Sequence, residues 1–362
     1  MSDTLRDVFP AVYGPLLPEL FDRPEIRETR ATCGDCAMCD KGSAQRHLTS
    51  LFRPDLKCCT YHPTLPNYLV GAVLDDGEHA DGCRRMREKI AARIGVTPEW
   101  IASPRKYRVL WEAGHVRGYG QSEALVCPYL DREGGLCTIW KHRESVCATF
   151  FCKHDRGAAD QSFWMAVKAY FFHVERVLAK YAARSVCEDA AEPGIPRLTL
   201  TVEDLADRPP GDEEYARYWR GWVGREEAFY VECHRRIGSL SAKDFETIVH
   251  ESGGREILAA VSSRYESVAS PTLANRLALN GKMRVVPSEG GVVATTYSRH
   301  DPVVLTQTVY DVLREVRPDE TVAEAIARLR RDRGLEVPEV LLLRMQQFEV
   351  MVSPPDGEKG ND

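Results

Sequence analysis

Apolar residues recur at helical spacing between residues 160 and 184, with charged and polar residues between them. Their intervals place them on one broad face of a helix, which we expect to pack in the core rather than to line a cofactor. The members of this face are Phe163, Trp164, Val167, Tyr170, Phe171, Val174, Leu178 and Tyr181. Similar spacing predicts a second long helix over 215–238. A third is predicted over 241–254, with Ser241 and Asp244 in capping-box positions and glycine at its end.

The segment after residue 280 has a different pattern. Two β-rich runs surround Gly290 and Gly291, which predicts a hairpin over 281–298. Helices are predicted to follow over 301–316 and 321–334, and the second of these has a Thr321/Glu324 capping box and ends at Gly334. The range 337–352 is predicted to form a third helix, or a helix that runs into a strand. Two strands and three short helices predict a winged-helix-like module.

Residues 33–157 contain many turn signals and little periodic apolar pattern. Here a helix is predicted over 83–95, closed by Gly95, and another is predicted to start at Thr97 as N-cap. The fold class is therefore expected to be mainly α with little β. Its expected parts are an irregular leader (1–32), an irregular cysteine-rich metal-binding domain with a closing amphipathic helix (33–186), a connector with one short strand at 197–202 (187–214), a helical middle segment (215–279), the C-terminal winged-helix-like module (280–353) and a disordered tail (354–362).

The composition narrows the functional classes. The chain has 362 residues and a formal net charge of -6, which argues against a nucleic-acid partner because such proteins usually carry a basic surface. The N-terminus lacks the features of a signal peptide, and no apolar run approaches the roughly 18 residues of a membrane span. We therefore expect a cytoplasmic protein without a membrane partner.

Cysteine is the residue type that stands out. The chain has 12 cysteines, and all but Cys187 and Cys233 lie between residues 33 and 152. Because the cytosol keeps thiols reduced, this clustering favours a metal site over disulfides. A nucleophilic cysteine, with Cys59 and His62 as thiol and base, is the weaker alternative, since it would need only one thiol.

The first group of cysteines lies in "CGDCAMC", where Cys33, Cys36 and Cys39 are three residues apart. A zinc knuckle uses two thiolates of such a turn, whereas a cubane iron–sulfur cluster can bind all three on different irons. The fourth ligand must then come from elsewhere, and Cys58 or Cys59 is a candidate.

The second group lies in "CPYLDREGGLCTIWKHRESVCATFFCKH" and contains Cys127, Cys137, Cys147 and Cys152. The apolar "ATFF" between the last two could shield a metal site from solvent. Arg143 could offset the charge of several thiolates. Further candidate ligands, for each of which an ordinary structural role stays open, are Asp40, His62, Cys83, His142 and His154.

These motifs resemble the YkgJ-type cysteine-cluster family, a zinc- or iron-chelating domain with an N-terminal Cys-x-x-Cys-x-x-Cys-Cys and a later "CPFL…C-I-Y…RP…C…C". In this sequence, "CPYL" corresponds to the "CPFL" of the second motif, and "CTIW" corresponds to its "C-I-Y". Asp40 stands where the eighth cysteine is expected, and Glu144 and Ser145 follow Arg143 where a proline is usual. The C-terminal segment more weakly resembles winged-helix domains of the PqqD type, which implies a protein or peptide partner.

We therefore expect a metal-binding protein with a redox role, a metal-handling role or an accessory role in a modification pathway. The favoured cofactor is a 4Fe–4S cluster, and Zn²⁺ is the alternative. A metal-dependent protein- or peptide-modifying enzyme stays open, because related cysteine frames occur in a flagellin lysine N-methylase. A structural-zinc interaction protein stays open as well. The expected metal ligands are Cys33, Cys36, Cys39, Cys58, Cys59, Cys127, Cys137, Cys147 and Cys152.

Overall fold

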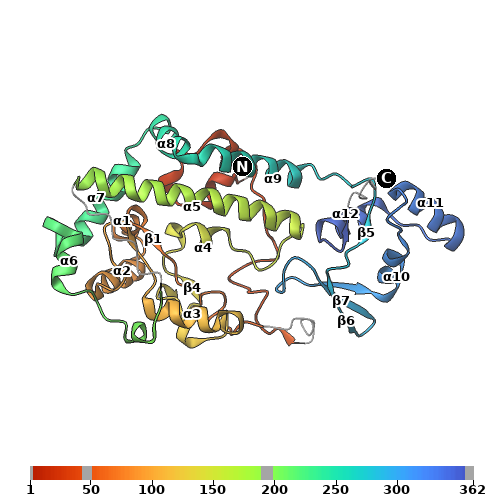
Figure 1. The fold of residues 1–362 in the computed structure, drawn as a ribbon, viewed down its shortest axis with the longest axis horizontal. Helices are drawn as coiled ribbons and strands as arrows, with labels where there is room; N and C mark the ends of the chain where they lie inside the picture. The colour runs from red at the N-terminus through yellow and green to blue at the C-terminus, as the bar shows by residue number, and fades with distance from the viewer. Residues whose placement is uncertain (1–2, 43–50, 189–198, 355–362) are drawn as a thin grey trace, which may run out of the picture.

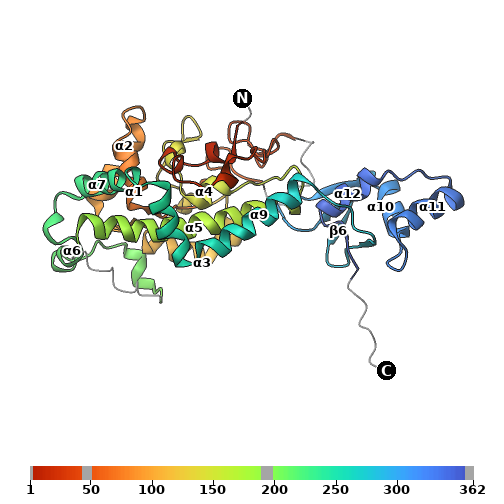
Figure 2. The ribbon, with the colours of Figure 1, turned by 90° about the horizontal axis from the view of Figure 1, so that it is seen from above.

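The computed structural model describes residues 3–42, 51–188 and 199–354. The chain is mainly helical, as predicted. Buried residues between Leu5 and Val268 form a large hydrophobic core, which defines the large unit. Buried residues between Leu277 and Met351 form a second core, which defines the C-terminal unit. Figures 1 and 2 show the second unit, in blue, at one end of the molecule beyond α9. Among the described residues, no helix combines the length and apolar character needed to cross a membrane.

The long helix α5 (Ala158–Val186) runs through the large unit, as Figure 1 shows. Its predicted apolar face is buried in the core, apart from Tyr181, which is 37% exposed. Helices α7 (Glu226–Gly238) and α9 (Arg255–Ala269) pack on α5, and α1 (Asn67–Leu74) packs on α7. Gly71 permits this last contact, because a Cβ there would lie 2.0 Å from the carbonyl oxygen of Tyr230.

The single helix predicted over 215–238 is wrong. Helix α6 (Asp212–Trp219) ends in the 3-10 turn η8 (Arg220–Trp222), and α7 starts afresh at Glu226. The break passes through Gly224, which has a φ of 76°. It lets Trp219 turn back onto Phe229 and Tyr230 in edge-to-face contacts, so tertiary packing outweighs the helical spacing of the sequence.

The capping box of Ser241 and Asp244 is confirmed at the start of α8 (Ala242–Val249). The helix predicted over 241–254 does not end at its glycines, because the chain only kinks there and continues as a helix. A π-helical turn, η9 (His250–Gly254), joins α8 to α9, and Gly253 has a φ of 99° within it. The chain can therefore change direction here without leaving the helical conformation for long.

The N-terminal leader is irregular, as predicted, but it is packed into the large core. It forms three 3-10 turns, η1 (Leu5–Val8), η2 (Ala11–Tyr13) and η3 (Glu19–Asp22). Phe9 stacks on Phe171 of α5, with 3.7 Å between ring centroids. Prolines interrupt the segment too often for an α-helix, so its apolar side chains reach the core from turns.

Between the leader and α5, short elements hold long loops. Strand β1 (Leu65–Pro66) pairs with β2 (Trp100–Ile101), and α2 (Ala80–Ala92) lies between them in sequence. The helix predicted from Thr97 is wrong. The Thr97 hydroxyl accepts a hydrogen bond from the Trp100 amide, as an N-cap would, but Trp100 then pairs with Pro66. The next helix, α3 (Arg105–Gly118), begins after Pro104.

The cysteine-rich segment continues with elements of two to five residues: η5 (Glu123–Leu125), β3 (Leu130–Asp131), β4 (Leu136–Cys137), η6 (Trp140–His142) and α4 (Ser145–Thr149). After α5, the strand predicted at 197–202 lies partly outside the described residues. Its last residue, Val202, begins the 3-10 helix η7 (Val202–Ala206) instead. The tail predicted to be disordered, 354–362, lies outside them except for Pro354.

The C-terminal unit contains the predicted hairpin, with β6 (Arg284–Ser288) paired to β7 (Gly291–Thr295). The helix predicted from 301 is wrong at its start: β8 (Val303–Thr306) pairs with β7, and α10 (Gln307–Glu315) follows. The β-branched run finds a partner strand, which local helical spacing cannot reveal. The unit is completed by α11 (Val322–Arg333), α12 (Glu339–Gln347) and the pair β5 (Ala278–Leu279) with β9 (Met351–Val352).

Candidate metal centre

Eight of the nine cysteines expected to bind metal line one cavity of about 400 Å³ in the large unit. They come from three stretches that are far apart in the sequence and meet in the fold. The eight are Cys33, Cys36, Cys58, Cys59, Cys127, Cys137, Cys147 and Cys152. The ninth, Cys39, does not line the cavity. It is buried beside Met38 and Phe52, and its thiol hydrogen-bonds that of Cys36.

Backbone hydrogen bonds and one lysine hold these stretches together. The amide of Cys127 donates to the carbonyl of Cys59 over 2.8 Å, which joins the cysteine doublet to the β3–β4 hairpin. Lys57 precedes the doublet, and its Nζ donates to the carbonyls of Cys33 (2.8 Å) and Gly135 (2.7 Å). This one ammonium therefore ties the first cysteine stretch, the doublet and the hairpin turn to one another.

The short helix α4 presents Cys147 to the cavity. Glu144 is its N-cap, and its carboxylate accepts from the amides of Val146 (2.6 Å) and Cys147 (3.0 Å). Ser145 donates from its amide and hydroxyl to Glu175 of α5, over 2.6 and 2.7 Å. Glu144 and Ser145 thus cap α4 and fasten it to the long helix. Burial raises the pKa of both carboxyl groups.

The mostly apolar wall of the cavity raises the pKa of several of its thiols. Burial raises the pKa of Cys127 and of Cys152 to about 12 each, and burial together with the nearby Glu144 carboxylate raises that of Cys147 well above its ordinary value. Thiolate ligation requires deprotonation, so metal binding at this site would release protons.

One arginine in the cavity wall carries positive charge toward the thiols. Burial lowers the pKa of Arg143, and the nearby Cys147 and Cys137 oppose that shift. The Arg143 Nη1 donates to the carbonyl of Cys147 over 2.9 Å, and the guanidinium lies 3.4 Å from the ring centroid of Trp140. This fixed cation could balance part of the charge of several thiolates.

Other residues of the cavity wall escape sequence reasoning. Aromatic residues form much of the wall, and Phe150 of the predicted "ATFF" wall is among them. Phe151 instead packs on Trp164 of the core. Isolated residues that carry no motif signal also contribute, and these are Lys57, Tyr61, Trp111, Tyr119 and Arg299. Arg299 comes from the C-terminal unit, which therefore supplies part of the wall.

The additional candidate ligands do not line the cavity. Asp40 is exposed and accepts from the amide of Gly42, and the Cys83 thiol donates to the carbonyl of Leu74. The histidines are engaged with other groups. His62 lies beside Pro63 and Lys89, His142 bonds Asp76, and His154 lies 3.3 Å from the carboxylate of Glu28.

The described cavity thiols form no group of three that lies close enough together to hold a single ion. Among the described residues, ligand atoms of three His, Cys, Asp or Glu side chains lie mutually within 4.8 Å in one place, at Asp76, Glu78 and His79, and this place contains no cysteine. Three thiolates on one zinc ion would lie about 3.8 Å apart, given Zn–S bonds of about 2.3 Å. The thiols therefore surround the cavity without converging on a point.

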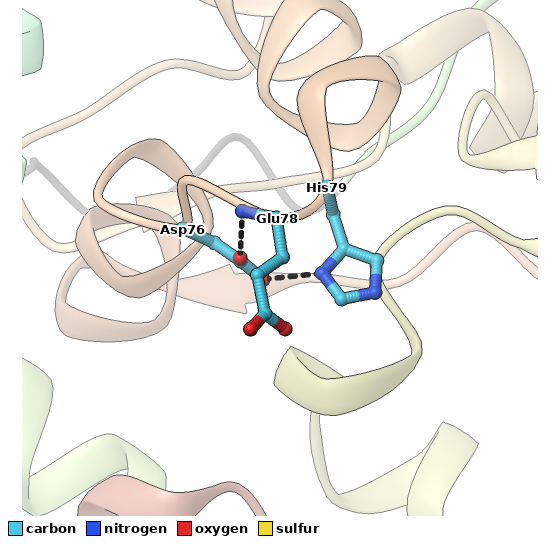
Figure 3. Close-up of side chains that lie close together, drawn as sticks. All are labelled: Asp76, Glu78 and His79. Carbon is cyan, nitrogen blue, oxygen red and sulfur yellow. Dashed lines mark hydrogen bonds and ion pairs between the residues drawn. The ribbon is translucent and has the colours of Figure 1, made fainter.

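The group at Asp76, Glu78 and His79, drawn in Figure 3, is an ion-pair network. The Asp76 carboxylate accepts from the Glu78 amide (2.9 Å), His79 Nδ1 (2.8 Å) and His142 Nε2 (2.8 Å). The Glu78 carboxylate is paired with Lys141 over 2.7 Å. Burial opposes ionisation of Asp76, but these bonds hold its pKa below the usual value. The network ties the loop between α1 and α2 to η6, next to Arg143.

Comparison of the chain with protein-family models, with curated proteins and with solved structures gave no match.

Proposed function

We propose that cysteines among the eight in the cavity hold an iron–sulfur cluster, with 4Fe–4S, which binds four thiolates, as the favoured type. The observation that carries this proposal is the lining of one cavity by eight thiols from three distant stretches of the chain. Thiolate sulfur is the donor that such clusters use. The residues present therefore fit the group in donor type, and the eight thiols are more than the four that one 4Fe–4S cluster binds.

The spacing of the thiols supports a cluster rather than mononuclear zinc. A zinc ion draws its thiolates together, whereas a cubane binds each cysteine on a different iron and keeps the sulfurs further apart. The cavity volume of about 400 Å³ agrees with a cluster, which is larger than a zinc ion. Among the described residues, no three thiols lie mutually within 4.8 Å, which also agrees with a cluster. The aromatic wall would also exclude water and oxygen, which zinc does not require.

The function that follows best is electron transfer or redox sensing. When bound, the cluster would supply one-electron chemistry. The protein's own residues would set its environment through the apolar wall, the Arg143 cation and the Cys147 amide that Glu144 holds. Handling of metal for another protein would use the same thiols.

We also propose that residues 280–353 form the winged-helix-like module. Supporting this are the three-stranded antiparallel sheet β6-β7-β8 and the helices α10, α11 and α12 around one small core. Expression of residues 271–354 alone, which includes the core residue Leu277 and strand β5, tests the proposal. A cooperatively folding fragment would agree with a module, and an unfolded fragment would contradict it.

Anaerobic purification followed by iron, sulfide and zinc analysis tests the cluster. We expect iron and sulfide in equal amounts and visible absorption at about 400 nm that bleaches with dithionite. Cys147→Ser should lower the iron content. Cys83→Ser is the matched control, because Cys83 is buried outside the cavity and its bond to Leu74 can be kept by a hydroxyl. A colourless protein with about two zinc ions per chain would overturn the proposal.

A further inference from the structure

A loop of the C-terminal unit, residues 296–301, lies against the cysteine-bearing part of the large unit. Arg299 lines the cavity. The His300 ring contacts Phe52 and Tyr119, with ring centroids 5.6 and 6.0 Å apart. Phe52 packs in turn on Cys39. The loop therefore forms part of the cavity wall and rests on the residues behind the first cysteine stretch.

The strongest contact of this loop is made by Asp301, whose side chain is fully buried. Its carboxylate accepts from Arg30 Nη2 over 2.7 Å and from the amide of His154 over 3.1 Å, and it also bonds the Tyr297 hydroxyl. Lys153 Nζ lies 3.6 Å away and donates to the carbonyl of His300 over 2.7 Å. A buried carboxylate needs such partners, and those of Asp301 come from both units.

The partners of Asp301 flank cavity cysteines in the sequence. Lys153 and His154 directly follow Cys152, and Arg30 lies three residues before Cys33. Both cysteines line the cavity. Few residues separate each cysteine from a group that holds Asp301, so a shift of Cys152 or Cys33 can be transmitted to the Asp301 site.

A second contact adjoins the first. Phe348 of the C-terminal unit packs against Gly157, where a Cβ would lie 2.7 Å from the Phe348 ring. Gly157 is the N-cap of α5, lies five residues after Cys152 and has a φ of 60°. The Arg30 guanidinium lies 5.9 Å from the Phe348 ring centroid. The docked unit thus depends on the backbone path from Cys152 to α5.

We propose that the 296–301 loop is a latch that couples the cysteine cavity to the position of the C-terminal unit. This inference rests on the proposed function. Cluster ligation fixes Cys33 and Cys152, which aligns Arg30, Lys153 and the His154 amide to receive Asp301. Loss of the cluster frees these segments and releases the unit. Coupling of this kind is reciprocal, so a docked loop also slows the loss of the cluster.

Hydrogen exchange in the full-length protein, with and without its iron, tests the latch. In the wild type, we expect amides of residues 297–301 to exchange at least tenfold faster after anaerobic removal of iron by a chelator. Asp301→Asn keeps the shape of the side chain but removes its charge. It should exchange fast in both forms and should lose iron to the chelator several-fold faster than the wild type.

Asp311→Asn is the matched control, because the Asp311 carboxylate on α10 accepts from Gln307 within the C-terminal unit. It should behave as the wild type does. If Asp301→Asn does not fold, Arg30→Gln removes the same ion pair from its partly exposed side and should give the same two effects. Unchanged exchange on iron removal would overturn the latch and leave the cluster intact as a proposal. A protein that binds no iron would overturn both.

Discussion

His62 should make the protein less stable in mild acid. Its side chain is buried, and the ring is held neutral by its surroundings. The ring Nδ1 donates to the Pro63 carbonyl over 3.0 Å, and Nε2 accepts from Lys89 Nζ over 3.3 Å, which assigns the tautomer. Burial, with the charge of Lys89 as the second cause, lowers the pKa of His62 to about 3.

The sign and size of the effect follow from linkage. An unfolded histidine has a pKa of about 6.5, so between that pH and about 3 the unfolded chain binds a proton that the folded chain does not. Stability is therefore complete above about pH 6.5 and falls as the pH decreases toward 3. Integration over the range from pH 6 to pH 4 gives a loss of about 2 to 3 kcal/mol from His62 alone.

Urea unfolding of the wild type and of His62→Gln at several pH values between 4 and 7 measures this loss. The variant cannot take up the proton, so its unfolding free energy should fall less over this range, by about 2 to 3 kcal/mol. Any cost of the substitution at pH 7 cancels, since only the change with pH is compared. Equal pH dependence in the two proteins would refute the assignment of a buried, neutral His62.

Three substitutions outside the cavity test the packing, each by urea unfolding. Gly71→Ala should cost about 3 kcal/mol or more, because its Cβ would meet Tyr230 and force α1 from α7. Gly114→Ala, at an exposed position of α3 with open space around it, should instead stabilise by about 0.5 to 1 kcal/mol, and a loss there would contradict this. Thr321→Ala removes the capping box of α11 and should cost about 1 kcal/mol, whereas an unchanged stability would show that the cap is dispensable.

The helices that could be predicted from the sequence carry their own signals. The apolar face of α5 repeats over about five turns, and α11 has both its capping box at Thr321 and its αL glycine at Gly334. Neither signal depends on a distant partner. Where the structure disagrees, a distant partner decides. Trp219 turns back onto Tyr230 and breaks the helix, and Val303 to Thr306 pair with β7 although helical spacing continues through them.

The candidate site shows the same division. Clustering of cysteines is a property of the sequence, and it predicted a shared site for nine thiols. The direction of each thiol is a property of the fold. Cys36 and Cys39 lie three residues apart in one turn, yet Cys36 lines the cavity while Cys39 packs on Met38 and Phe52. Spacing alone treats the two as equivalent.

The remaining wall of the cavity could not be predicted because its members have no common pattern. Lys57 acts through a side chain that reaches two carbonyls about 24 and 78 residues away in sequence, and Arg299 enters from a unit with its own core. A ligand motif records which atoms can bind a metal. It does not record what excludes water from them or which part of the chain moves when they bind. In this protein, single residues on distant loops complete the wall around the thiols, and the buried carboxylate of Asp301 joins the loop that carries Arg299 to Arg30 and to the His154 amide.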